Sequence, residues 1–338
     1  MATIKDIATA AGVSSATVSR VLNADEKLQI SAATRQRVFA AAESLNYSKP
    51  RPRHVKATGT VSVIQWFTPE AEMNDLYYRT IRWGAETALQ AAGYAVARSF
   101  APDDLPQRTD IAGIIAIGKY SDRQLLRLKA LKRPLIVVDQ DTLGFDISCV
   151  TTDFGHAVAA IVDRLSTSGH DRIGMIAGTE STSDMQPLVD PRLAEFRAYI
   201  PVNRRLSERD IFMGPFSIEG GYESMQHAIS KLGKLLPSAF FAASDTLAIG
   251  AIKALREAGL RVPDDVAIIG FNDLAVGRYL TPSLSTVHVA TETMGSAAVE
   301  LLTKQMAGHL VTPVNVVIAS ELQLRESSRV FHKGTKAS

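Results

Sequence analysis

The sequence predicts a chain of two parts: a small, all-helical head of three helices and a larger α/β body whose parallel sheets form two lobes. The 338 residues exceed the roughly 150 residues of a typical domain. Hydrophobic spacing changes near residue 60, from a helical period to short β-branched runs that alternate with helical stretches. Charge changes at the same place, because residues 1–58 carry a net charge of +5 and the remainder carries −3. A basic head on a mildly acidic body suggests that the head binds a polyanion.

The head is expected to begin with two short helices joined by a tight turn. Thr3 can cap the first helix, and Gly12 can end it in the left-handed conformation. Ser14 is a favourable N-cap for the second helix, and a third helix is expected after Ser31. The inward-facing residues of the three helices are Ile4, Ile7, Ala8 and Ala11, then Val18, Val21 and Leu22, then Thr34, Val38, Ala41, Ala42 and Leu45.

Two helices around a glycine turn form a helix-turn-helix, in which the second helix fits the major groove of DNA. Arg20 can donate a pair of hydrogen bonds to guanine, and small polar side chains near it can reach base edges or phosphates. The basic charge of the segment favours this interpretation over a helical hairpin that binds nothing. The candidate DNA-binding residues of the head are Thr3, Ser14, Ser15, Ala16, Thr17, Ser19, Arg20 and Asn23.

From Thr60 onward, the alternation of short apolar runs and helical stretches is typical of a mostly parallel sheet covered on both faces. Ligands of such sheets bind beyond the carboxyl ends of the strands. The expected strands are 60–66, 111–117, 134–138, 173–177, 239–242 and 266–270. The expected helices lie near 76–92, 122–131, 154–168, 218–231 and 245–258.

Polar side chains follow three of these strands and can converge on the hydroxyl groups of a ligand. They are Asp139, Ser244 with Asp245, and Asn272 with Asp273. Arg192 opens a helix and can donate a fork of hydrogen bonds. Aromatic side chains can supply flat walls for sugar rings, namely Trp66, Phe67, Tyr77, Tyr78 and Phe216. The candidate effector-binding residues are Trp66, Phe67, Tyr77, Asp139, Arg192, Phe216, Ser244 and Asn272.

Several motifs are shared with one family of regulators; they are Thr3–Ala8, Gly12–Asn23, Thr151–Asp153, Gly169–Gly174, Phe241–Gly250 and Val262–Asp273. Through them the chain resembles the LacI/GalR family of bacterial repressors, from Thr3 to about Arg325. The resemblance implies that Ser15 and Ala16 select the operator and that Arg20 contacts a base. It also implies a periplasmic-binding-protein-like effector domain, in which a sugar is held by Arg192, Ser244 and Asn272 against Phe216. Asn272 is often Asp in the family, so the amide implies a different hydroxyl selectivity.

A narrower resemblance is to the branch of the family that controls an evolved β-galactosidase operon, and it implies a β-galactoside as the effector. The segments that carry it are Asn74–Tyr78, Ile81–Arg82 before Gly84, Ala243–Gly250, Leu284–Val287 and Met294–Ser296.

The hinge that follows the third helix departs from the family pattern. Relatives insert a leucine from a short hinge helix into the minor groove, which kinks the duplex. Here that position falls near Val55 or Lys56, and Pro52 interrupts the helix that Pro50 can begin. Arg53 and Val55 are therefore predicted to contact DNA. A polyproline-like linker that touches phosphate only is the alternative.

The predicted domains are a head with hinge at 1–58, the hinge spanning about 47–58, and an effector-binding and dimerisation domain at 59–338. One lobe comprises about 59–157 with 287–318, and the other about 158–286 with 319–330. Two heads must bind two half-sites of a pseudo-palindromic operator, so a homodimer is expected. The tail Glu326–Ser338 has no leucine heptads, and a tetramer-forming coiled coil is not expected.

The sequence therefore predicts a cytoplasmic transcriptional repressor whose operator affinity is switched by a small sugar. It has no nucleotide-binding glycine motif and no His pair at metal spacing, so no enzyme, cofactor or metal site is expected. The single cysteine, Cys149, is expected to be a small buried hydrophobe, and no apolar run is long enough to cross a membrane. The alternatives are a stand-alone sugar-binding protein and a LacI-type regulator that needs a corepressor or a protein co-regulator.

Overall fold

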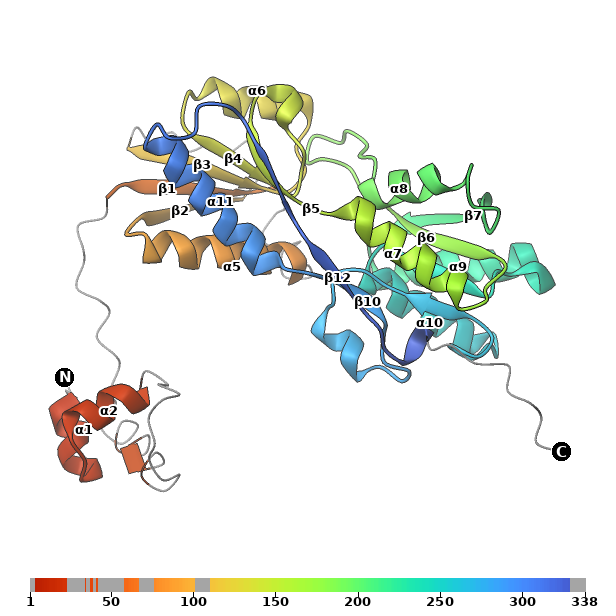
Figure 1. Ribbon diagram of the computed structural model, residues 1–338, viewed down its shortest axis with the longest axis horizontal. Helices are drawn as coiled ribbons and strands as arrows, with labels where there is room; N and C mark the ends of the chain where they lie inside the picture. The colour runs from red at the N-terminus through yellow and green to blue at the C-terminus, as the bar shows by residue number, and fades with distance from the viewer. Residues whose placement is uncertain are drawn as a thin grey trace. The chain divides into compact units, whose positions relative to one another are not determined.

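The computed structural model describes residues 4–22, 34, 37, 38, 41, 58–66, 76–100 and 110–328. The chain divides into two compact units, Met1–Lys56 and Ala57–Ser338 (Figure 1). The predicted hinge residues Arg53 and Val55 lie outside the described residues, as do Thr3, Asn23 and Phe67.

The first unit contains helices α1 (Ile4–Ala11) and α2 (Ser15–Leu22). Gly12 separates them with a φ of 64°, a left-handed conformation that glycine adopts without strain, as the sequence predicted. Residues 34, 37, 38 and 41 are helical, and the rest of the predicted third helix lies outside the described residues. The buried core consists of Ile7, Ala8, Ala11, Val18, Val21, Val38 and Ala41, all of which were predicted to face inward.

The first lobe of the second unit is built on a six-stranded sheet in the order β11-β5-β4-β3-β1-β2. All of its strand pairs are parallel. Its strands are β1 (Thr60–Gln65), β2 (Ala95–Phe100), β3 (Ile111–Ile117), β4 (Leu135–Val138), β5 (Ser148–Thr152) and β11 (Asn315–Ile318). The central strands β3 and β4 are buried at every position except Ala112, which explains their continuous apolar runs.

Helices cover both faces of this sheet. Helix α6 (Asp122–Ala130) lies on one face, and α5 (Leu76–Ala91) and α11 (Thr291–Met306) lie on the other (Figure 1). Glycines set the close approach of α5 and α11. A Cβ atom at Gly84 would lie 2.5 Å from the carbonyl oxygen of Glu292, and one at Gly295 would lie 2.3 Å from that of Ile81.

The second lobe contains a four-stranded parallel sheet in the order β7-β6-β8-β9. Its strands are β6 (Ile173–Thr179), β7 (Leu206–Pro215), β8 (Ala239–Ala242) and β9 (Ala267–Ile269). Its helices are α7 (Phe154–Thr167), α8 (Pro191–Tyr199), α9 (Ile218–Leu232) and α10 (Asp245–Glu257). Helices α9 and α10 pack closely at Gly250, where a Cβ atom would lie 1.9 Å from the carbonyl oxygen of Ile218.

The chain passes between the lobes three times. Strand β5 leads into α7, and β10 (Thr286–Val289) leads back into α11. Strand β11 then leads into β12 (Ser320–Gln323), which pairs antiparallel with β10. These crossings place the carboxyl ends of both parallel sheets on the space between the lobes, where a ligand of such a fold binds.

The α/β fold class and the six expected strands are confirmed, with ends that shift by one or two residues. The remaining strands and one helix were not predicted from the sequence; they are β2, β5, β7, β10, β11, β12 and α11. Strands β2, β7 and β11 lie at sheet edges. In β2 and β7 the exposed positions accept polar residues, and the apolar pattern is lost. Strand β5 is fully buried, but three of its five residues are Ser or Thr.

Candidate DNA-binding head and effector cleft

Helix α2 presents the predicted recognition surface. Ser14 is its N-cap, because the Ser14 hydroxyl accepts a hydrogen bond from the Thr17 backbone N–H at 3.1 Å. The two hydroxyl groups also bond to each other at 2.8 Å, so they order the first turn of the helix. Ser15 and Arg20 are exposed, and Ala16 and Ser19 belong to the same helix. Arg20 is exposed near the end of this helix, a position from which an arginine can reach a base edge.

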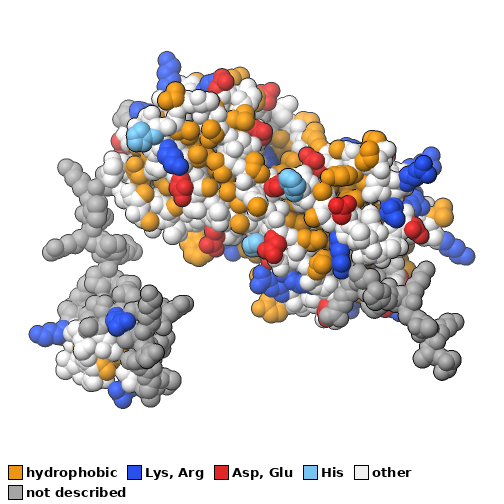
Figure 2. Space-filling view, viewed as in Figure 1, with side chains coloured by type: hydrophobic (Ala, Val, Ile, Leu, Met, Phe, Trp, Pro, Cys, Tyr) orange, Lys and Arg blue, Asp and Glu red, His pale blue; other side chains and the backbone are white. Residues whose placement is uncertain are grey.

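The charge of the two units differs at the surface. In the first unit, the described cations Lys5, Arg20 and Arg37 are all exposed. On the face of the second unit that Figure 2 shows, acidic and basic side chains are interspersed. The exposed cations of the head therefore suit a polyanionic partner better than the visible face of the second unit does.

A cleft of about 440 Å³ lies between the two lobes of the second unit. It is lined by strand ends, by the start of α5 and by aromatic side chains. Seven of the eight predicted effector residues line it, and the eighth, Phe67, lies outside the described residues. The seven are Trp66, Tyr77, Asp139, Arg192, Phe216, Ser244 and Asn272.

Asp139 joins three segments at the floor of the cleft. Its carboxylate accepts hydrogen bonds from the hydroxyls of Tyr77 at 2.9 Å and Tyr78 at 2.7 Å. The Lys119 ammonium lies 3.0 Å from Asp139 Oδ2 and also donates to the Asp139 carbonyl oxygen. Burial and the Asp139 charge raise the pKa values of both tyrosines well above the ordinary range, so they remain hydrogen-bond donors. Asp139 therefore holds the side chains at the floor of the cleft in place, and its carboxylate has little capacity left to accept a hydrogen bond from a sugar hydroxyl.

Trp66 forms one aromatic wall of the cleft. It is 3% exposed and meets Tyr78 edge to face, with 5.6 Å between ring centroids. The space for its ring depends on Gly118, which follows β3 with a φ of 119°. A Cβ atom at this position would lie 2.0 Å from the Trp66 ring.

Arg192 lies among aromatic rings in the second lobe. Its guanidinium carbon is 5.0 Å from the Phe216 ring centroid, 5.3 Å from that of Phe271 and 5.7 Å from that of Phe154. Arg192 Nε donates to Asp190 Oδ1 at 2.8 Å. Burial opposes the charge, but Asp190 outweighs it and raises the pKa of Arg192. Within the described part of the chain, the two terminal nitrogens have no hydrogen-bond partner, so they can donate to a ligand.

Ser244 and Asn272 line the cleft in different ways. Ser244 is the N-cap of α10, since it accepts from the Leu247 N–H at 3.2 Å and bonds to the Thr246 hydroxyl at 2.7 Å. The Asn272 backbone has a φ of 106° and donates to the Val287 carbonyl at 2.9 Å. Its side-chain amide has no partner among the described residues and can meet a hydroxyl group.

The expectation that Asp245 and Asp273 point into the cleft is wrong. Asp245 is fully buried behind it and accepts from the Thr286 hydroxyl and the Leu274 N–H, each at 2.6 Å. Burial raises the pKa of Asp245 to about 7. Asp273 turns toward Arg325 at 2.6 Å and Arg278 at 2.9 Å. Neither aspartate lines the cleft, and both bond to the loops beneath it.

Lys119 and Glu180 line the cleft and were missed by the sequence analysis. Both follow strands, Lys119 two residues after β3 and Glu180 directly after β6, so position at a strand end was the signal available. Burial raises the pKa of Glu180 to about 7, although Lys119 and Arg192 attract its charged form. The cleft thus contains two fixed cations and a carboxyl group that titrates near neutral pH.

In the described segments, no group of three or more His, Cys, Asp or Glu side chains is placed to hold a metal ion. No helix within those segments is long and apolar enough to span a bilayer. Cys149 is buried, as predicted, and burial raises the pKa of its thiol.

Comparison with known proteins identifies the family. Residues 3–49 match the model of bacterial regulatory proteins of the lacI family, and residues 162–328 match a periplasmic binding protein-like domain. The HTH-type transcriptional regulator GalR of Lacticaseibacillus casei is 42% identical over 97% of this chain and 100% of its own length. The chain belongs to the lacI family. GanR of Bacillus subtilis (strain 168), also an HTH-type transcriptional regulator, is 35% identical over 97% of this chain and 99% of its own length.

Solved structures of lacI-family regulators share the fold. The complex of the transcriptional regulator CelR with cellobiose has a TM-score of 0.71 at 27% identity, covering 97% of this chain and 100% of that one. The lac repressor dimer bound to operator and the anti-inducer ONPF has a TM-score of 0.70 at 24% identity, covering 97% and 99%. The lacI-family chain described here is thus a DNA-binding transcriptional regulator, and the prediction that it is not an enzyme agrees with the names of its relatives.

Proposed function

We propose that this lacI-family chain is a cytoplasmic, homodimeric repressor that binds a pseudo-palindromic operator and releases it when a β-galactoside occupies the cleft between the lobes. The observation that carries the sugar-binding part is the convergence of the free terminal nitrogens of Arg192 and the Asn272 amide on a cleft walled by aromatic rings. Such a combination of flat apolar surface and few fixed polar groups suits a sugar ring. The relative solved with cellobiose supports a sugar ligand for this type of cleft.

The switch follows from the position of the cleft. A ligand that contacts Asn272 and Arg192 in one lobe and Tyr77 in the other stabilises one lobe orientation. If the dimer holds its two heads at half-site spacing only in the other orientation, ligand binding lowers operator affinity by the difference in ligand affinity between the two states. The β-galactoside itself is inferred from the sequence resemblance described above.

The test begins with purified full-length protein and a random duplex library, from which the preferred palindrome is selected. Fluorescence anisotropy on that duplex is then measured with increasing galactose, lactose, cellobiose or maltose. We expect lactose to raise the apparent Kd for DNA, with little change from maltose. Tighter DNA binding in the presence of sugar would favour the corepressor alternative. Sugar binding without selection of any duplex would favour a stand-alone sugar-binding protein.

A further inference from the structure

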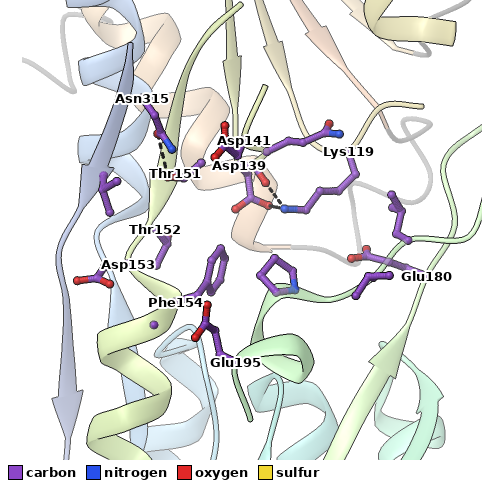
Figure 3. Close-up of a pocket in the computed structure, with 16 residues that line it drawn as sticks. Lys119, Asp139, Asp141, Thr151, Thr152, Asp153, Phe154, Glu180, Glu195 and Asn315 are labelled. Carbon is purple, nitrogen blue, oxygen red and sulfur yellow. Dashed lines mark hydrogen bonds and ion pairs between the residues drawn. The ribbon is translucent and has the colours of Figure 1, made fainter. Parts of the chain in front are cut away.

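A second cavity of about 360 Å³ lies in the same second unit, beside the effector cleft (Figure 3). Its walls come from the ends of β4 and β5, from β11 and from α8 with the loop before it. Figure 3 shows Phe154 among the residues that line this cavity, between Glu195 on one side and the Lys119–Asp139 pair on the other. No predicted effector residue other than Asp139 lines it.

The two cavities share walls. Lys119, Asp139, Phe154 and Glu180 line both of them, so one side of this group faces the effector cleft and the other faces the second cavity. Phe154 is half-buried and is braced by Phe271, with 6.0 Å between ring centroids. The effector cleft and the second cavity therefore adjoin each other at Phe154.

The lining of the second cavity offers hydrogen-bonding groups that the protein does not use internally. The Asn315 side chain accepts from the Thr151 hydroxyl at 3.0 Å, which leaves its amide N–H groups without a partner among the described residues. The Glu195 carboxylate is half-buried and has no hydrogen bond or ion pair within the described part of the chain. An amide donor and a carboxylate acceptor beside an aromatic ring suit the hydroxyl groups and the apolar face of a sugar ring.

The charge of the lining restricts the class of ligand. The carboxyl groups of Asp139, Asp141, Asp153, Glu180 and Glu195 line the cavity, and Lys119 is the cation among its described lining residues. Lys119 is already paired with Asp139. A phosphate or carboxylate in this space would meet uncompensated negative charge, so an uncharged ligand is favoured.

From this arrangement we propose that the second cavity is a subsite for a further ring of a neutral oligosaccharide whose first ring occupies the effector cleft. The inference rests on the proposed sugar-binding function and names the size class of the effector as a disaccharide or longer. Asn315 and Glu195 are the residues that contact the second ring, so they affect the binding of a disaccharide and not that of a monosaccharide.

The experiment is isothermal titration calorimetry of the full chain with galactose, lactose and galactose 1-phosphate. Wild type is expected to bind lactose more tightly than galactose, and galactose 1-phosphate more weakly than galactose. Glu195→Ala and Asn315→Ala are each expected to weaken lactose binding about tenfold, the effect of one hydrogen bond to a charged group or a comparable polar contact. Their galactose affinity should stay within about twofold, since neither residue lines the effector cleft.

Two further variants make the readout specific. Glu223→Ala removes the same charge from an exposed position on α9 and should leave both affinities unchanged. Gly155→Leu places a side chain in the second cavity, because a Cβ atom there meets nothing closer than the Glu195 carboxylate at 3.7 Å. It should reduce lactose binding and spare galactose binding.

The outcomes separate this inference from the proposed function. Glucose and cellobiose are titrated in parallel. If the protein binds these sugars and not the galactosides, the proposed β-galactoside effector is contradicted. The comparison of cellobiose with glucose then still tests the subsite. Equal loss of monosaccharide and disaccharide affinity in the variants would overturn the subsite. The subsite would also be overturned if wild-type protein bound neither disaccharide more tightly than the corresponding monosaccharide. Absence of binding by every sugar would count as the same result.

Discussion

At the scale of single residues, the side chains of the cleft are of two kinds. Some bond to other parts of the protein, and others have polar atoms that can bond to a ligand. Asp139 has a φ of 78°, a conformation that costs a non-glycine residue on the order of 1–3 kcal/mol. Its bonds to Tyr77, Tyr78 and Lys119 can offset that cost. Arg192 and Asn272 keep polar atoms unused in the described structure, which marks them as ligand contacts.

Arg192 is expected to be essential for the response to sugar. Arg192→Ala should abolish sugar-induced release of DNA, because the fork of donors is lost, while operator affinity without sugar stays unchanged. Arg192→Lys keeps the charge beside Asp190 but not the fork, and should also respond poorly. Anisotropy with calorimetry measures both, and circular dichroism checks that each variant is folded. A normal sugar affinity in Arg192→Lys would show that the paired guanidinium donors are not needed for sugar binding.

Arg20 is expected to read one base pair. Arg20→Ala should cost about 1–3 kcal/mol on the selected duplex and relax the preference at one position. Arg37→Ala removes another exposed cation of the head and should weaken all sequences alike. Binding titrations against single-base variants of the operator distinguish the two. Uniform loss in Arg20→Ala would assign Arg20 to phosphate.

Glu180 is expected to make stability depend on pH. Its pKa is about 7 in the folded chain, above the ordinary value of 4.5, so the folded state binds the proton more tightly. Its contribution is therefore fully present below pH 4.5 and is lost as the pH rises toward 7. Glu180→Gln should remove this dependence. Urea unfolding between pH 5 and 8 should show the variant gaining free energy of unfolding relative to wild type as pH rises, and a constant difference would contradict the assignment.

At the scale of elements, glycine positions determine how closely helices pack. The α5–α11 contact in the first lobe and the α9–α10 contact in the second both place a glycine against a backbone carbonyl. Backbone atoms cannot rotate away as side chains do, so these contacts tolerate no added carbon.

Gly84→Ala should therefore destabilise the second unit by about 1–3 kcal/mol through overpacking against Glu292. Gly155→Ala is the matched control, because it lies in helix α7 and its added Cβ would stay 3.7 Å from any neighbour. That control should be neutral or slightly stabilising. Chemical denaturation of both variants measures the difference. Equal stabilities would show that α5 and α11 can separate at little cost.

At the scale of the whole molecule, two half-sites require two heads, and we expect a dimer in solution. Light scattering of the purified chain should give about twice its mass of 36.5 kDa, with or without sugar. A stable tetramer would contradict the expectation drawn from the tail, which lacks leucine heptads.

The sequence by itself determined the two-part architecture, the inward face of the head helices and seven of the residues that line the effector cleft. Local patterns carry this information, because helical spacing, capping residues and strand-end polar groups are properties of short segments. Edge strands such as β2 and β7 were missed because pairing with a distant neighbour, rather than their own composition, makes them strands.

Only the tertiary structure decided what each cleft residue does. Asp139, Asp245 and Asp273 all follow strands, yet Asp139 holds the cleft floor and the other two turn to partners behind it. Lys119 and Glu180 gain their place in the cleft from contacts with residues far away in the chain. The direction of a side chain at a strand end and the charges that surround it depend on how the lobes meet, which no short segment encodes.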